Sequence, residues 1–168
     1  MKTKNLTVRL TRSAAIAALY VAFTWLSAIF GLSSGVIQFR ISEALCILPI
    51  FFPEAVLGLF IGCILANLLT GALIWDIVFG ALATLLGALG ARLLRGLPEK
   101  AKWITTLPTV LANVLIIPPV LIYAYGVPDA WWFIALTVFI GEAVCSGVGG
   151  AMLYYTFKKS SATRKFIL

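Results

Sequence analysis

The chain has 168 residues, of which 62% are hydrophobic and 11% charged, and its formal net charge is +7. A soluble domain of this length needs far more charged surface, so the composition excludes one and indicates an integral membrane protein. The sequence also contains no histidine, the commonest metal ligand and general base, and we expect no metal site, cofactor or catalytic group.

Apolar segments predict one all-α membrane domain over residues 1–168, a compact bundle of six transmembrane helices. They lie at about 13–31, 38–52, 54–73, 76–95, 104–125 and 130–157. The first follows a basic stretch, but its apolar part is longer than that of a signal peptide, so we interpret it as an uncleaved span. Residues 41–73 would measure ~50 Å as one helix, too long for one crossing. Pro49 and Pro53 predict the break between the second and third spans.

The positions of Lys and Arg predict the topology of this bundle. Four lie before the first span, four in the connection 92–102, four in the C-terminal tail, and Arg40 stands apart. Because basic residues favour the cytoplasmic side, we expect both termini and this connection in the cytoplasm. Four spans before the connection and two after it satisfy that arrangement. The positive charge is therefore explained as an orientation signal, and no nucleic-acid partner is expected.

Small residues recur at four-residue spacing in the first span, as Ala14, Ala18 and Ala22. A face of this kind allows another helix to approach closely inside a membrane. Packing within the bundle explains most such faces in this chain. For the first span, contact with another protein is an equally good interpretation.

Several polar side chains fall inside the predicted spans. Glu142 lies near the middle of the last span, where an ionisable group costs ~2.5–3.5 kcal/mol or more, and no Lys or Arg is predicted at that depth. We therefore favour a ligand or proton role for it. Asn67 and Asn113 fit a bridge between helices and a ligand contact equally well. Asp76 fits a helix cap and a ligand contact equally well.

The stretch IQFRISEAL, residues 37–45, places polar side chains at the start of the second span. Arg40 is the one basic residue on the predicted outer side. Glu43 follows it by three positions, so the two would share a helix face, and Gln38 leads into that face. Ser42 is predicted to be a helix cap. A polar pocket that opens outward explains this group. Aromatic residues expected either around the pocket or as interfacial anchors are Phe39, Trp75, Tyr123, Tyr125, Trp131 and Trp132.

The motifs of common enzymes are missing. The sequence has no GxxxxGK[ST] phosphate-binding loop, no HExxH and no GxSxG. We therefore expect a binding and translocation protein, not an enzyme, that takes its energy from an ion gradient or a partner.

The chain resembles the queuosine-precursor transporter family of the QueT type. The segments that carry the resemblance are GVIQFRISEAL (35–45), LPIFFPEAVLGLFIGCILAN (48–67), WDIVFGALAT (75–84), LANV (111–114) and GE (141–142). The resemblance implies a substrate-binding S component of a bacterial energy-coupling factor (ECF) transporter in the cell membrane. Such a subunit works with a transmembrane scaffold subunit and two ATPase subunits, and the alanine face of its first span docks on the scaffold.

The resemblance also implies a 7-deazaguanine ligand such as preQ0, preQ1 or queuine. A guanine edge offers two parallel N–H donors, which one carboxylate accepts together. We predict that Glu142 or Glu43 takes this edge, and that the other acid, or Asp76, meets an aminomethyl cation. Candidate donors to the O6 acceptor are Asn67, Asn113 and Arg40. The alternatives are an S component for another vitamin or nucleobase, a stand-alone carrier coupled to protons through Glu142, and lastly an intramembrane enzyme.

Overall fold

The computed structural model describes residues 2–32 and 38–159, with side chains from residue 6 onward. Within these ranges the chain is helical and contains no strand, which confirms the predicted all-α fold. The α-helices are α1 (Lys2–Ile29), α2 (Ala55–Leu69), α3 (Ile74–Leu93), α4 (Leu107–Tyr123), α5 (Trp131–Glu142) and α6 (Gly150–Lys159). The 3-10 helices are η1 (Ile41–Ile50), η2 (Leu94–Gly96) and η3 (Glu99–Thr106), and η4 (Ala143–Gly149) is π-helical.

Four helical stretches are long and apolar enough to cross a membrane. They are Leu6–Ile29, Ile74–Gly96, Glu99–Tyr123 and Trp131–Lys159. The other two apolar helices, Ile41–Ile50 and Ala55–Leu69, are shorter. All six predicted segments are therefore helical in the predicted order. Six complete crossings and cytoplasmic termini stay predictions.

The break in the second apolar stretch falls where the prolines predicted it. Pro49 lies inside the last turn of η1, Pro53 follows in the connection, and α2 begins at Ala55. The upstream helix differs from expectation because it is a 3-10 helix, whose ~2.0 Å rise per residue stretches ten residues over ~20 Å. Arg40 precedes this helix with extended backbone (φ −100°, ψ 96°). The prediction that Arg40 and Glu43 share a helix face is therefore wrong.

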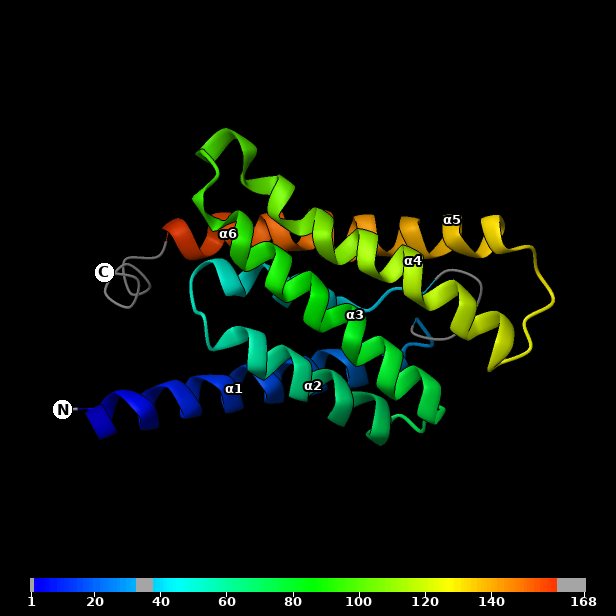
Figure 1. The fold of residues 1–168 in the computed structure, drawn as a ribbon, viewed down its shortest axis with the longest axis horizontal. Helices are drawn as coiled ribbons and strands as arrows, with labels where there is room; N and C mark the ends of the chain where they lie inside the picture. Colours follow the sequence, from blue (N-terminus) through cyan, green and yellow to red (C-terminus); the bar gives the residue numbers. More distant parts are fainter. Residues whose placement is uncertain (1, 33–37, 160–168) are drawn as a thin grey trace.

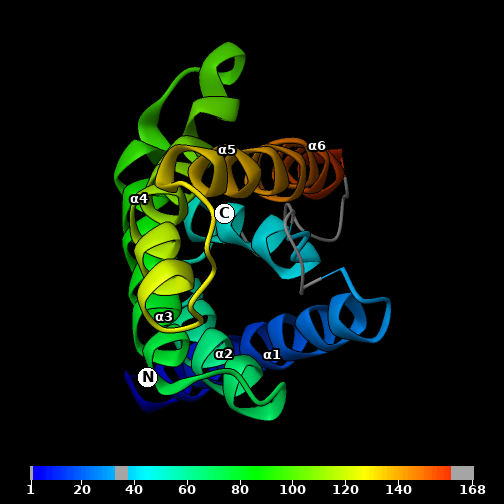
Figure 2. The same cartoon turned by 90° about the vertical axis from the view of Figure 1, so that its right-hand side faces the viewer.

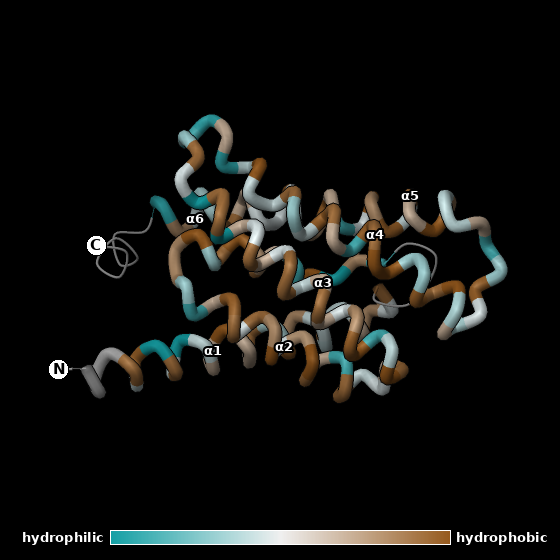
Figure 3. Tube along the Cα trace, in the orientation of Figure 1, coloured by the Kyte–Doolittle hydropathy of each residue, from teal (hydrophilic) through white to brown (hydrophobic). Residues whose placement is uncertain are grey.

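The connections between helices gather at two opposite ends of the bundle. The start of α1, the η1–α2 turn, the η2–η3 connection and the end of α6 lie at one end (Figure 1). The end of α1 and the α2–α3 and α4–α5 connections lie at the other (Figure 1). Hydrophilic residues occur at both ends, while the helices between the ends are largely apolar (Figure 3). The grouping of the connections at two ends matches the one that the positions of the basic residues predicted.

The short helix η1 lies inside the bundle, between α1 and the α5–α6 rod (Figure 2). Seven of its ten residues are buried. On the α1 side, glycines in α2 allow close packing: a Cβ on Gly58 would lie 2.6 Å from the carbonyl oxygen of Ser13, and one on Gly62 would lie 2.9 Å from Cβ of Tyr20. The α1 face with Ser13 and Tyr20 is therefore buried against α2.

Candidate functional site

A polar cavity of about 620 Å³ lies at the end of the bundle where η1 begins. Helices α2 and α3 and the α4–α5 connection contribute to its wall. Four residues singled out in the sequence line it: Gln38, Arg40, Asn67 and Asp76. Tyr125 and Asp129 line it as well. Segments far apart in the chain thus bring their polar side chains to one space.

Arg40 is held in the cavity wall by two partners. Its Nη2 lies 3.4 Å from Oδ2 of Asp76, and its Nη1 donates to Oδ1 of Asn67 at 3.5 Å. The hydroxyl of Tyr125 donates to the same Asp76 oxygen at 3.2 Å, and Nδ2 of Asn67 donates to the main-chain oxygen of Asp76 at 3.2 Å. The side chains of Arg40 and Asp76 are 16% and 9% exposed, so this is a largely buried ion pair. A buried guanidinium needs such a carboxylate, which explains a basic residue at this end of the bundle.

A glycine on α5 allows the extended segment that carries Arg40 to reach the cavity. A Cβ on Gly141 would lie 2.0 Å from the main-chain oxygen of Gln38. No side chain fits in that gap. The position of the Gln38–Arg40 segment therefore depends on Gly141.

A second, smaller cavity of about 20 Å³ borders the first, because Gln38 and Arg40 line both. Asn113 and Glu142 complete its polar wall. Its volume suffices for about one water molecule. Glu142 is 8% exposed, and its Oε2 atom has no hydrogen-bond partner among residues 2–32 and 38–159. Buried acceptors normally have a hydrogen-bond partner, so this oxygen is available to accept a hydrogen bond from a ligand.

Glu142 is also the last residue of α5 before the π-helical turn η4. A π-helical turn changes the direction of the side chains that follow it and occurs frequently at functional sites. Asn113, on the facing helix α4, donates from Nδ2 to the main-chain oxygen of Thr109 at 3.1 Å. Its amide oxygen is left for another donor.

Glu43 lies apart from the other candidate residues. It is 2% exposed and belongs to the lining of neither cavity. Its carboxylate accepts hydrogen bonds from the hydroxyl of Tyr20 and, at 3.2 Å, from the thiol of Cys46. Ser42 likewise points to α1, where it accepts a hydrogen bond from Thr24 at 2.8 Å. In this structure Glu43 joins η1 to α1, and six of the seven predicted residues surround the cavities.

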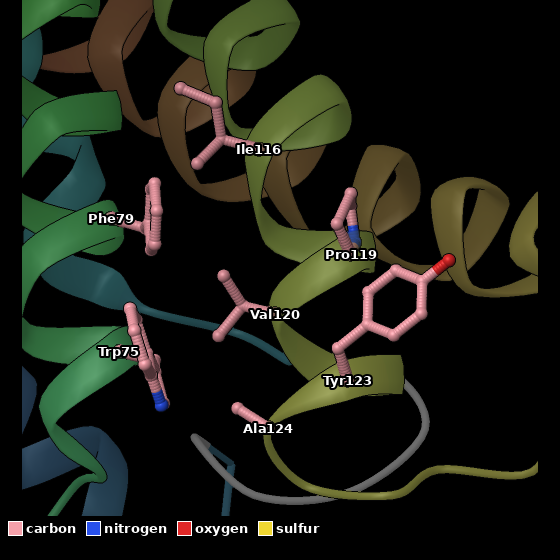
Figure 4. A pocket seen from close by; sticks show the side chains of 7 residues that line it. All are labelled: Trp75, Phe79, Ile116, Pro119, Val120, Tyr123 and Ala124. Carbon is pink, nitrogen blue, oxygen red and sulfur yellow. The ribbon is translucent and has the colours of Figure 1, made fainter.

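Three of the six aromatic residues singled out in the sequence line one of two spaces. Tyr125 lines the polar cavity, whereas Trp75 and Tyr123 line an apolar hollow of about 520 Å³ between α3 and α4, with Phe79 and Val120 (Figure 4). The lining of this hollow carries no carboxylate, amide or basic group. Its polar side-chain atoms are the indole nitrogen of Trp75 and the hydroxyl oxygen of Tyr123 (Figure 4), so it offers no carboxylate to the donor edge of a guanine-like base.

The alanine face of α1 points outward. Ala14, Ala18 and Ala22 are exposed and line an apolar groove of about 1140 Å³ between α1 and α2. Leu57, Ile61 and Leu65 of α2 form the facing wall of the groove. Packing among the residues that the structure describes therefore leaves this face uncovered.

The sequence reasoning missed Asp129 as a candidate site residue. It lies in the short connection between α4 and α5 and lines the large cavity near its exposed rim. Polar residues stand out when they fall inside a predicted span, and Asp129 falls outside the spans, in a loop. The signal that could have found it is an acidic residue within the predicted outer connection at 126–130.

The polar cavity offers several groups to a flat polar ligand. Glu142 and Asp129 are acceptors, and the amide of Asn113 supplies a further acceptor beside the buried carboxylate. Arg40 and Asn67 supply donors, although both already bind partners in the wall. The surrounding helices are apolar, so these groups act in a region of low dielectric, where each hydrogen bond is stronger than in water.

Comparison with known proteins gives an independent line of evidence. A curated relative, "Queuosine precursor transporter QueT" of Lactococcus lactis subsp. cremoris, is 35% identical over 82 residues. This match covers 49% of the chain and 48% of the relative, about half the length of each. No solved structure matches the chain. The family model described as QueT transporter matches residues 10–159. Because that match covers most of the sequence, the chain belongs to the QueT transporter family.

Proposed function

We propose that this chain binds a queuosine precursor, a 7-deazaguanine base, in the polar cavity and takes part in its uptake across the cell membrane. Membership of the QueT transporter family supports this, as does the name of the relative from Lactococcus lactis. The observation that carries the binding site is the buried Oε2 atom of Glu142, which has no partner among the described residues and borders the cavity.

The chemistry of a guanine edge fits this acceptor. The ring N–H and the exocyclic amino group are parallel donors, and a carboxylate accepts both at once. In the proposed complex Glu142 accepts these two hydrogen bonds. The edge of the base would then enter the small cavity beside Glu142. Arg40 lines the same cavity, so its guanidinium is the candidate donor to the O6 acceptor.

In this proposal the chain is the S component of an ECF transporter, with six membrane-embedded helices and both termini in the cytoplasm. It performs no catalytic step itself. A scaffold subunit and two ATPase subunits would supply the energy from ATP. The exposed face of Ala14, Ala18 and Ala22 supports a docking partner, because a groove lined by small and apolar residues suits close helix packing in a membrane.

The binding claim is tested by mass spectrometry of the small molecule that co-purifies with the full chain, followed by titration calorimetry. The probes are preQ1, preQ0 and queuine, with guanine and adenine as controls. We expect a deazaguanine to co-purify and to bind at least tenfold more tightly than adenine, which lacks the same donor edge. Equal binding of adenine, or co-purification of an unrelated vitamin, would overturn the proposed substrate.

The docking claim is tested with the double substitution A14L/A18L in cells that also express the scaffold and ATPase subunits. Bulky side chains there should abolish uptake and leave ligand binding by the purified chain unchanged. The matched control is Ala15→Leu, because Ala15 is exposed on the same helix but does not line the groove. Normal uptake by cells that carry A14L/A18L would contradict the docking claim.

A stand-alone carrier coupled to protons is the second candidate, favoured by Oε2 of the buried Glu142, which has no partner within the described part of the chain. Reconstituted vesicles that contain this chain alone separate the two candidates. The S-component proposal expects no accumulation of preQ1 under a pH gradient. Accumulation that depends on the gradient would favour the carrier.

A further inference from the structure

The charges that line the large cavity do not balance. One guanidinium, Arg40, faces two carboxylates, Asp76 and Asp129. Arg40 and Asp76 pair with each other, and the ion pairs found among residues 2–32 and 38–159 do not include Asp129. The cavity as a whole therefore carries an excess of negative charge, which favours a cationic ligand over a neutral one.

Asp129 has no observed structural task. It stands two residues before α5, whose N-cap is Ala130, and no side-chain hydrogen bond caps this helix. Its carboxylate belongs to the cavity lining near the exposed end. The Asp129 carboxylate therefore lies beside an open cavity and has no partner among the described residues, as expected of a group that binds a ligand.

Asp129 and Glu142 lie toward opposite ends of α5. That helix runs from Trp131 to Glu142, which corresponds to ~16 Å along its axis. In a 7-deazaguanine the substituent at position 7 points away from the N1 and 2-amino edge. If Glu142 holds that edge at the inner end, the substituent points back toward the open end of the cavity and Asp129.

We infer that Asp129 is a specificity-determining residue that binds a cationic aminomethyl arm on the base, while Glu142 binds the guanine edge. This inference rests on the proposed function and further specifies that the preferred ligand carries a positive charge. The preferred substrates are then bases with an ammonium group on the arm, preQ1 foremost, over the uncharged nitrile preQ0.

The test is titration calorimetry of preQ1 and preQ0 with the purified full chain and with Asp129→Asn. We expect wild type to prefer preQ1, and the substitution to weaken preQ1 by roughly 3- to 5-fold, the upper part of the usual scale for one exposed charge pair. Binding of preQ0 should not change, which also shows that the variant is folded. Asp129→Glu should restore most of the preference. A matched acidic control is Glu99→Gln, because Glu99 is exposed and pairs with Lys158 away from the cavity.

Each other outcome has a distinct meaning. If preQ0 and preQ1 bind wild type equally, or if Asp129→Asn weakens both or neither, the inference is overturned while the proposed function stands. If neither base binds wild type, the proposed function itself fails. A loss of preQ1 affinity at high salt in wild type but not in Asp129→Asn would add support, because salt screens an exposed charge pair.

Discussion

Two buried carboxylates pair with arginines at opposite ends of this bundle, one at the start of α2 and one at the start of α3 (Figure 1). At the first, Oε1 of Glu54 lies 3.1 Å from Arg12, and Oε2 lies 3.9 Å from Arg9. At the second, Asp76 lies 3.4 Å from Arg40. The carboxylate side chains are 6% and 9% exposed, so by charge and by burial of the acid the two pairs look alike.

The surroundings of the two pairs differ. At the first, Ser13 donates to the main-chain oxygen of Glu54 at 2.8 Å, and the Arg12 guanidinium lies 5.4 Å from the centre of the Phe52 ring. That pair ties α1 to α2. The Asp76 pair instead lines a cavity of about 620 Å³ that borders the unpartnered oxygen of Glu142. An ion pair therefore does not identify a site. The cavity and the unsatisfied acceptor beside it do.

The largest expected effect comes from Glu142→Gln, which removes the acceptor that distinguishes the second region. A glutamine accepts only one of the two donors of a guanine edge, and about 3 kcal/mol for two charge-assisted hydrogen bonds corresponds to a loss of roughly 100-fold in affinity. Titration calorimetry with preQ1 measures this. The melting temperature of the ligand-free protein should not fall, because Oε2 of Glu142 has no partner to lose among the described residues. A change in affinity below threefold would remove Glu142 from the site.

Gly141→Ala tests whether the close approach of backbone to α5 holds the cavity together. The new Cβ would meet the main-chain oxygen of Gln38 at 2.0 Å, so the Gln38–Arg40 segment must move. Overpacking of this kind costs about 1–3 kcal/mol, and we expect affinity for preQ1 to fall roughly tenfold. The control is Gly96→Ala, where no described atom lies within 4 Å of the added carbon. Unchanged binding and stability in Gly141→Ala would contradict the geometry of this segment.

The sequence predicted the helical segments of this fold well, for a simple physical reason. Long apolar runs and prolines act locally, so the break near Pro49 and the order of the six segments follow from the chain itself. The type of the second helix did not follow. A 3-10 helix was not anticipated from the local residues, and it begins at Ile41, so that Arg40 lies outside it with extended backbone.

The site was predictable where burial of a polar group is costly in itself. Asn67, Asn113 and Glu142 stood out because lipid tolerates such groups poorly. Glu43 stood out for the same reason, but its partner is Tyr20, which is 23 residues away and reached through tertiary packing. Asp129 shows the opposite case, since an acidic residue in a loop costs nothing and attracts no notice until the fold places it on a cavity wall.

The smallest effect is expected at the other end of the comparison, in Glu54→Gln. Arg12 and Arg9 are 34% and 59% exposed, so solvent screens this pair and its loss should lower the free energy of unfolding by about 1 kcal/mol. Thermal unfolding of the purified chain should show a drop of a few degrees, and affinity for preQ1 should stay within twofold. The hydrogen bond from Ser13 persists, because it reaches the main-chain oxygen of Glu54 and not the carboxylate. A fivefold loss of affinity would mean that the two ends of the bundle are energetically coupled, so that the tie between α1 and α2 also shapes the cavity.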